Sequence, residues 1–369
     1  PDGAGRGAER PDGADCQGKL IFMSTSSSAS AALAPAGGLR RPVTDWLFAV
    51  LTLALGAWGF AAYGVAMDGY EKAILAAAVP SVIAMGWFWR PLRLLLVLVG
   101  LATWGAMTLY QQHTDAHGAD LAYADQVFWL KYFLSRQSAI LWMSVLFFMS
   151  TAFYWIGLVA RSATATKLGS RLTWAGIFMA LVGTLVRWFE SHQIAPDIGH
   201  IPVSNLYEVF VLFAWLTAAY WLYYEDRFAR MGRDLGSLGA FVMLVVSAAV
   251  GCLLWYALER GAHEIQPLVP ALQSWWMKLH VPANFIGYGT FALAAMVAFA
   301  YLIKQQASET RWYKLAPLWL LGVVLCFEPL VFRQSGSNSA AYWAIYFGVS
   351  ALIVGGILAM RRRIAERLP

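Results

Sequence analysis

The sequence predicts an all-α integral membrane protein, a polytopic bundle of about ten transmembrane helices with both termini in the cytoplasm. Of its 369 residues, 59% are hydrophobic, 15% are aromatic and only 13% are charged. A water-soluble globule cannot bury that much apolar surface. From Trp46 onward, apolar runs long enough to cross a bilayer follow one another with short polar breaks between them. Basic residues gather in every second break, as they do in membrane proteins.

Each apolar run is expected to be a helix, because a strand or loop exposed to lipid cannot satisfy its backbone N–H and C=O groups. The second and third runs are close to the minimum length for a span. The expected spans are residues 46–66, 74–89, 94–110, 138–160, 172–188, 203–224, 236–258, 281–303, 315–332 and 342–360.

The loops between these spans predict the orientation, since cytoplasmic loops carry an excess of Lys and Arg. With the N-terminus inside, every inner segment is basic, from Arg40 and Arg41 to the cluster that begins at Arg361, whereas the outer loops hold scattered Lys and Arg. The same topology puts all six histidines on the outer side: His113, His117, His192, His200, His263 and His280. Any imidazole chemistry is therefore expected at the outer face.

Outside the spans, residues 1–40 are rich in Gly, Ala, Ser and Asp and cannot form a packed core. We expect a disordered leader there, with the true start at Met23 and without the long apolar core of a cleavable signal peptide. The membrane part is expected to divide into N-terminal helices over residues 41–171 and a second unit over residues 172–369.

Charge and cysteine content exclude several classes of protein. The net charge of +6 comes from basic residues scattered among loops, not from one stripe, so nucleic-acid binding is not expected. Cys252 and Cys326 lie inside expected spans and Cys16 lies in the leader. With no CxxC or CxxCH in the chain, it is neither a c-type cytochrome nor a dithiol oxidoreductase by its own residues.

The first candidate site lies where the span at 281–303 begins. Pro282 suits the first turn of a helix, which predicts that His280 lies at or just before the helix start. The positive end of the helix dipole favours neutral imidazole, the form that binds metal. His280, Asn284, Gly287 and Phe291 are expected to share one helical face. On the alternative reading, His280 is a solvated boundary residue and the preceding tryptophans, Trp275 and Trp276, are interfacial anchors.

The second candidate site is the short outer loop between the spans at 172–188 and 203–224. Arg187 and Glu208 lie slightly within the membrane at similar depth, and buried charges in lipid seek partners, so we predict that they pair or share a polar cluster. Ser204 or Asn205 can cap the incoming helix. His200 is expected close enough to share an outer vestibule with His280. On the alternative reading, this is a tight loop held by a salt bridge and a cap.

Two stretches carry a family resemblance: GHIPVSNLYEVFVLFAW at 199–215 and LVPALQSWWMKLHVPANFIGYG at 268–289. In this order, one span apart, they resemble the heme-handling membrane protein of system II cytochrome c biogenesis, the family called CcsA, ResC or, in many bacteria, CcsB. The resemblance implies a bacterial inner-membrane protein that binds heme b, its transported substrate, at the outer face. With a ResB/Ccs1-type membrane partner, such a protein presents heme for covalent attachment to the CxxCH of apocytochrome c.

The resemblance also implies roles for residues. His280 corresponds to an outer axial ligand of heme iron, Trp275 and Trp276 would support the macrocycle at the interface, and His200 is a further candidate for the same vestibule. The complete family complex acts as a cytochrome c heme lyase. The family's tryptophan-rich motif, of the WGxxWxWDPKE type, and its second outer ligand are absent from this sequence. We therefore expect a C-terminally incomplete member whose residues 172–369 form a partial cytochrome c assembly domain.

Two other functions remain open at this point. A secondary transporter could use the Arg187 and Glu208 cluster to couple substrate or proton movement, although no convincing internal repeat is found. A membrane scaffold that holds a partner in the bilayer is the third possibility.

Overall fold

The computed structural model describes residues 41–65, 67, 69–115, 118–194, 198–267, 270, 273–320 and 340–369. Within these residues, eight helices are long and apolar enough to cross a membrane, and they occupy the first eight expected spans. The helices are α2 (Val43–Tyr63), α3 (Gly69–Phe88), α4 (Pro91–Tyr110), α5 (Arg136–Ala160), α6 (Ala163–Ile194), α7 (Leu206–Arg230), α8 (Gly236–Arg260) and α9 (Trp275–Gln305). The expected class, an all-α polytopic membrane bundle, is confirmed.

The rest of the described chain is short elements and one further helix. Most of the expected span at 315–332 lies outside the described residues, and α11 (Ala340–Ala365) takes the place of the last expected span. Between α4 and α5 lie the antiparallel strands β1 (Thr114–Asp115) and β2 (Gly118–Ala119), then η1 (Leu121–Gln126) and η2 (Leu130–Leu134). The 3-10 turn η4 (Trp312–Leu315) follows α9. The boundary expected at residue 171 falls inside α6.

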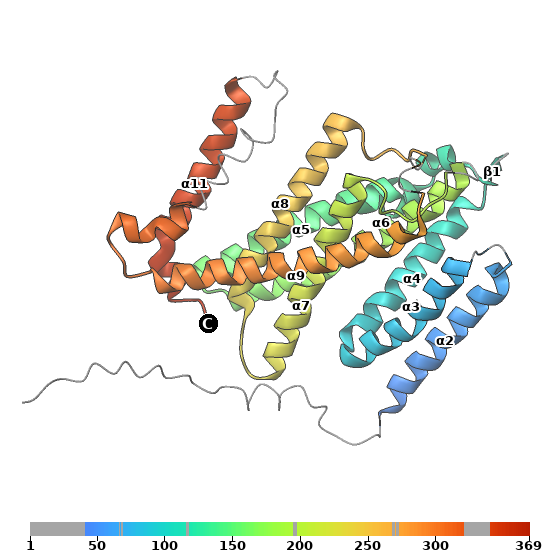
Figure 1. Cartoon of the computed structure of the whole chain (residues 1–369), viewed down its shortest axis with the longest axis horizontal. Coiled ribbons are helices and arrows are strands. Elements are labelled where there is room, and N and C mark those ends of the chain that lie inside the picture. The colour runs from blue at the N-terminus through green and yellow to red at the C-terminus, as the bar shows by residue number, and fades with distance from the viewer. Residues whose placement is uncertain are drawn as a thin grey trace, which may run out of the picture.

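The helices form a bundle with α5 to α8 at its centre (Figure 1). Helices α2, α3 and α4 lie together on one side, α9 packs against α7 and α8, and α11 lies on the side away from α2 (Figure 1). Few residues of α2 and α3 are buried within the chain, so their apolar surfaces are available to lipid.

The closest helix pair, α5 with α6, is explained by two seven-residue repeats. On α6, Gly169, Gly176 and Gly183 recur every seven residues, and on antiparallel α5 so do Tyr154, Phe147 and Ile140. A Cβ on each of these glycines would lie 2.9, 2.6 and 2.9 Å from Tyr154, Phe147 and Ile140 respectively. The large side chains of one helix therefore enter notches left by the other, as small residues allow in membrane bundles.

Candidate functional site

One end of the bundle carries all the histidines that the structure describes. His192 is in the last turn of α6, His200 is in the loop before α7, His263 follows α8 and His280 is near the start of α9. His113 follows α4 at the same end of the bundle, and His117 lies outside the described residues. An ion pair from Lys278 Nζ to Glu71 Oε1, at 3.2 Å, ties the start of α9 to the start of α3 there.

Arg187 and Glu208 form a buried ion pair at this end. Arg187 Nε donates to Glu208 Oε1 at 2.8 Å, and the two residues are 3% and 4% exposed. The other guanidinium nitrogens also have acceptors: Nη1 donates to the carbonyl of His263 at 2.6 Å and Nη2 to that of Glu264 at 3.2 Å. The pairing expected from similar membrane depth is thus formed, and Arg187 also fixes the loop that follows α8.

Glu208 is held from its own side as well. Its Oε2 accepts from both the backbone N–H and the hydroxyl of Ser204 at 2.8 Å. Of the two expected caps, Asn205 serves, because its Oδ1 accepts from the Glu208 N–H at 2.9 Å at the start of α7. The arrangement satisfies both charged groups, which is what burial of an ion pair requires.

His200 has both ring nitrogens engaged. Nδ1 lies 2.6 Å from the carbonyl oxygen of Ile198, to which it can only donate, and Nε2 lies 2.7 Å from Ser204 Oγ. His200 and Glu208 line a cavity of about 180 Å³ together with Arg260 and Glu264. To bind a metal ion, His200 must give up one of its hydrogen bonds.

His280 lies inside α9, not at its mouth, so the expectation drawn from Pro282 is wrong. The helix begins at Trp275 with Ser274 as its cap, whose Oγ accepts from the Trp276 N–H at 3.2 Å. Pro282 therefore sits in the helix interior. Because the dipole effect is confined to the first turn, the argument from the helix start does not apply to His280.

The environment of His280 nevertheless leaves the imidazole accessible. Its Nε2 lies 2.9 Å from Asn284 Nδ2, its ring is nearly parallel to that of Trp276 with centroids 6.0 Å apart, and the residue is exposed. Among the residues that the structure describes, Nδ1 has no hydrogen-bond partner. Two turns further on, a Cβ at Gly287 would meet nothing within 4 Å among the described residues. The side chain of Trp275 lies outside the described part.

The described residues do not show His200 and His280 lining one common cavity. Met277 and Val281 on α9 pack against Ile201 and Val203 of the His200 loop. His280 is exposed and is not among the residues that line the His200 cavity. The two histidines lie at the same end of the bundle, but the described residues place them in different environments.

A third polar group at this end was not predicted from the sequence. Glu190 is buried, accepts from the Tyr110 hydroxyl at 2.7 Å and from the Arg136 backbone N–H at 3.1 Å, and pairs with the Arg136 guanidinium at 3.2 Å. Glu190 lies three residues after Arg187, so both charges are on one helical face. This spacing was the sequence signal from which a role for Glu190 in the polar cluster could have been predicted. Glu190 links α6 to α4 and α5.

Comparisons with known proteins give a family match and several relatives. Residues 203–359 match the family described as cytochrome C assembly protein. The cytochrome c biogenesis protein CcsA of Chlorella vulgaris is 29% identical over 190 residues, which are 49% of this chain and 54% of the relative. That of Chlamydomonas reinhardtii is 35% identical over 120 residues (32% and 31%), and that of Gloeobacter violaceus 33% over 168 residues (44% and 46%).

Residues 203–359 are a cytochrome c assembly segment of the CcsA type. The resemblance expected from the stretches at 199–215 and 268–289 is thereby confirmed. The chain spans about a third to about half of the length of these three relatives. No solved structure matches it. The CcsA-type segment contains Glu208, Trp276 and His280, whereas Arg187 and His200 precede it.

Proposed function

We propose that this CcsA-type protein binds heme b, as a transported substrate, at the outer ends of its helices through His280. With a ResB/Ccs1-type membrane partner it would present the heme for attachment to the CxxCH of apocytochrome c. The observation that supports this most directly is the accessible His280 imidazole inside the CcsA-type segment, with one ring nitrogen free of protein partners among the described residues. The alternation of basic loops supports a periplasmic position for the histidine-bearing ends.

The chain's own residues account for how a flat ligand would be held. Trp276 lies one turn before His280 with its ring nearly parallel to the imidazole. Two turns after His280, a Cβ at Gly287 would meet nothing within 4 Å among the described residues. If Asn284 presents its amide oxygen to an Nε2–H, the proton is fixed on Nε2 and the lone pair on Nδ1 faces the ligand. An axial imidazole supplies the heme iron with a ligand while leaving the porphyrin edge, with its vinyl groups, accessible to thiols.

The buried ion pair of Arg187 and Glu208 supports the transporter hypothesis less well than a structural role. Each of the three guanidinium nitrogens of Arg187, and both carboxylate oxygens of Glu208, are already hydrogen-bonded within the protein. A group that couples transport must exchange partners, whereas these contacts hold the α6, α7 and α8 ends together.

His280→Gly is expected to remove most of the heme that copurifies with the protein. The substitution deletes the iron ligand without touching the packed face of α9, so the helix bundle should remain folded. Heme content is measured from the Soret absorbance per mole of protein, with and without added imidazole, which can refill the vacated ligand position. His192→Gly is the matched control, because His192 is an exposed histidine at the same end of the bundle. Unchanged heme in His280→Gly would refute the assignment.

Asn284→Ala is expected to weaken heme binding by about tenfold, the lower end of the effect of removing the partner of a metal-ligating histidine. Asn284→Gln keeps the amide and should bind more tightly than Asn284→Ala. Heme titration followed by absorbance gives the dissociation constants. Equal affinities for wild type and Asn284→Ala would show that the 2.9 Å contact with His280 has no part in the site.

A further inference from the structure

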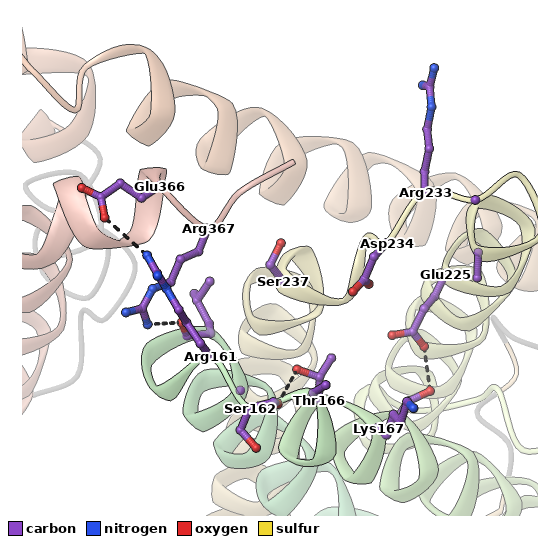
Figure 2. A pocket seen from close by; sticks show the side chains of 16 residues that line it. Arg161, Ser162, Thr166, Lys167, Glu225, Arg233, Asp234, Ser237, Glu366 and Arg367 are labelled. Atoms are coloured by element: carbon purple, nitrogen blue, oxygen red, sulfur yellow. Dashed lines mark hydrogen bonds and ion pairs between the residues drawn. The ribbon is translucent and has the colours of Figure 1, made fainter.

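A cavity in the described part of the chain lies at the opposite ends of the helices. Its volume is about 760 Å³, and its walls come from the end of α5, the start of α6, the end of α7, the start of α8 and the segment after α11. Figure 2 shows this lining, with Arg161, Glu366 and Arg367 on one side and Glu225 and Arg233 on the other. The volume is in the range of cavities that hold small organic ligands.

The acidic side chains of the lining are all engaged. Glu225 accepts from the Tyr154 hydroxyl at 3.0 Å and from Ser170 Oγ at 2.6 Å. Asp234 accepts from the Gly236 N–H at 2.8 Å at the start of α8, and Glu366 pairs with Arg161 at 3.7 Å. None of the three is therefore an open position for a cation.

Two basic side chains of the lining are available instead. Lys167 and Arg233 make no hydrogen bond or ion pair with any residue in the described part of the chain, and both are exposed. Arg233 extends away from the other side chains drawn, at the edge of the cavity (Figure 2). Arg161 adds a third charge, since an exposed pair at 3.7 Å with Glu366 is weak and easily exchanged.

Two helices begin and two end at this cavity. Helices α6, from Ala163, and α8, from Gly236, begin there, but α5 and α7 end there, so the helix dipoles offset one another and the positive charge comes from the basic side chains. Since the apolar helices α5 and α7 end at this cavity, we expect it to lie near the lipid headgroups. Basic pockets between transmembrane helices on the cytoplasmic side are sites for anionic lipid headgroups, and the basic-loop count assigns these ends to that side.

We propose that this cavity binds a phosphate group, that of an anionic phospholipid headgroup, through Lys167, Arg233 and Arg161. The acyl chains would leave along the apolar surface of the last turn of α5. The site is separate from the heme proposal, since it lies at the other ends of the helices.

The test measures cardiolipin binding to the purified full-length chain by native mass spectrometry, against phosphatidylcholine as the uncharged comparison. Lys167→Ala/Arg233→Ala is expected to weaken cardiolipin binding about 25-fold, or roughly fivefold for each surface charge removed. The charge-preserving Lys167→Arg/Arg233→Lys should retain binding. Arg362→Ala is the matched control: it removes an exposed arginine of α11 that does not line the cavity, and it should leave the affinity close to that of wild type.

A second arm identifies the source of the phosphate. Competition by inorganic phosphate or glycerol phosphate at millimolar concentration, with no preference for cardiolipin over phosphatidylcholine, would assign the site to a soluble phosphate. Cardiolipin preference without such competition supports the lipid. The proposal is overturned if Lys167→Ala/Arg233→Ala binds cardiolipin and phosphate as tightly as wild type does. It is also overturned if Arg362→Ala weakens cardiolipin binding as much as the double variant does.

Discussion

Arg187→Ala is expected to lower the free energy of unfolding by about 3–5 kcal/mol, the usual cost of leaving one member of a buried ion pair alone. The substitution strands the Glu208 carboxylate, which is 4% exposed, and leaves the carbonyls of His263 and Glu264 without their donor. Because those carbonyls belong to the loop between α8 and α9, the variant should also loosen the entry to α9.

The measurement is unfolding of the purified protein in mixed micelles with increasing denaturing detergent. Arg230→Ala is the matched control. Arg230 is exposed and pairs with Asp226 one helical turn before it, so its removal should cost less than about 1 kcal/mol. The double variant Arg187→Met/Glu208→Leu should cost less than the sum of the two single changes, because no lone charge remains. A cost for Arg187→Ala no greater than that for Arg230→Ala would contradict the ion-pair argument.

The contacts of Arg187 that are close in the sequence could be predicted, whereas those far away along the chain could not. Arg187 and Glu208 stand near the facing ends of consecutive helices, so equal depth was enough to predict their pairing. The carbonyls of His263 and Glu264 lie 76 and 77 positions away along the chain. No periodicity indicates which later loop will fold back over an arginine, so this half of its environment needed the structure.

The start of α9 shows where local rules fail. Proline disfavours a helix interior because it lacks an N–H and crowds the preceding turn. In membrane helices, neighbouring helices and side chains satisfy the freed groups, so interior prolines are tolerated. Pro80 inside α3 and Pro282 inside α9 are two such interior prolines. Ser274 was the better signal, because its hydroxyl supplies the cap and moves the helix start ahead of His280.

The spans themselves were predictable because composition and backbone satisfaction leave lipid-exposed segments one choice. The packing between the helices was less predictable from the sequence. The seven-residue spacing of Gly169, Gly176 and Gly183 is visible in the sequence, but nothing local indicates that Tyr154 and Phe147 are the side chains they receive. Side-chain volumes matched across two helices are a tertiary property.

Gly239→Ala is expected to lower the free energy of unfolding by about 1–3 kcal/mol, the cost of overpacking a filled core. A Cβ at Gly239, on α8, would lie 2.4 Å from Cε1 of Tyr154. The ring cannot retreat, because Gly169 of α6 lies against its other edge and the residue is fully buried. Its hydroxyl is also fixed, since it donates to Glu225 and accepts from Trp221 Nε1 at 3.0 Å each.

Helix α8 also contains a control glycine, at which an added methyl group is expected not to lower the free energy of unfolding. A Cβ at Gly251 would meet nothing within 4 Å, so Gly251→Ala should be neutral or stabilise α8 by up to about 1 kcal/mol, the helix-propensity difference between the two residues. Both variants are compared by detergent unfolding. In Tyr154→Leu/Gly239→Ala the smaller side chain relieves the overlap, so the double change should cost less than the sum of its parts. Equal effects at Gly239 and Gly251 would mean that the Tyr154 ring shifts freely, and that the three-helix contact around it does not determine how closely α5, α6 and α8 approach.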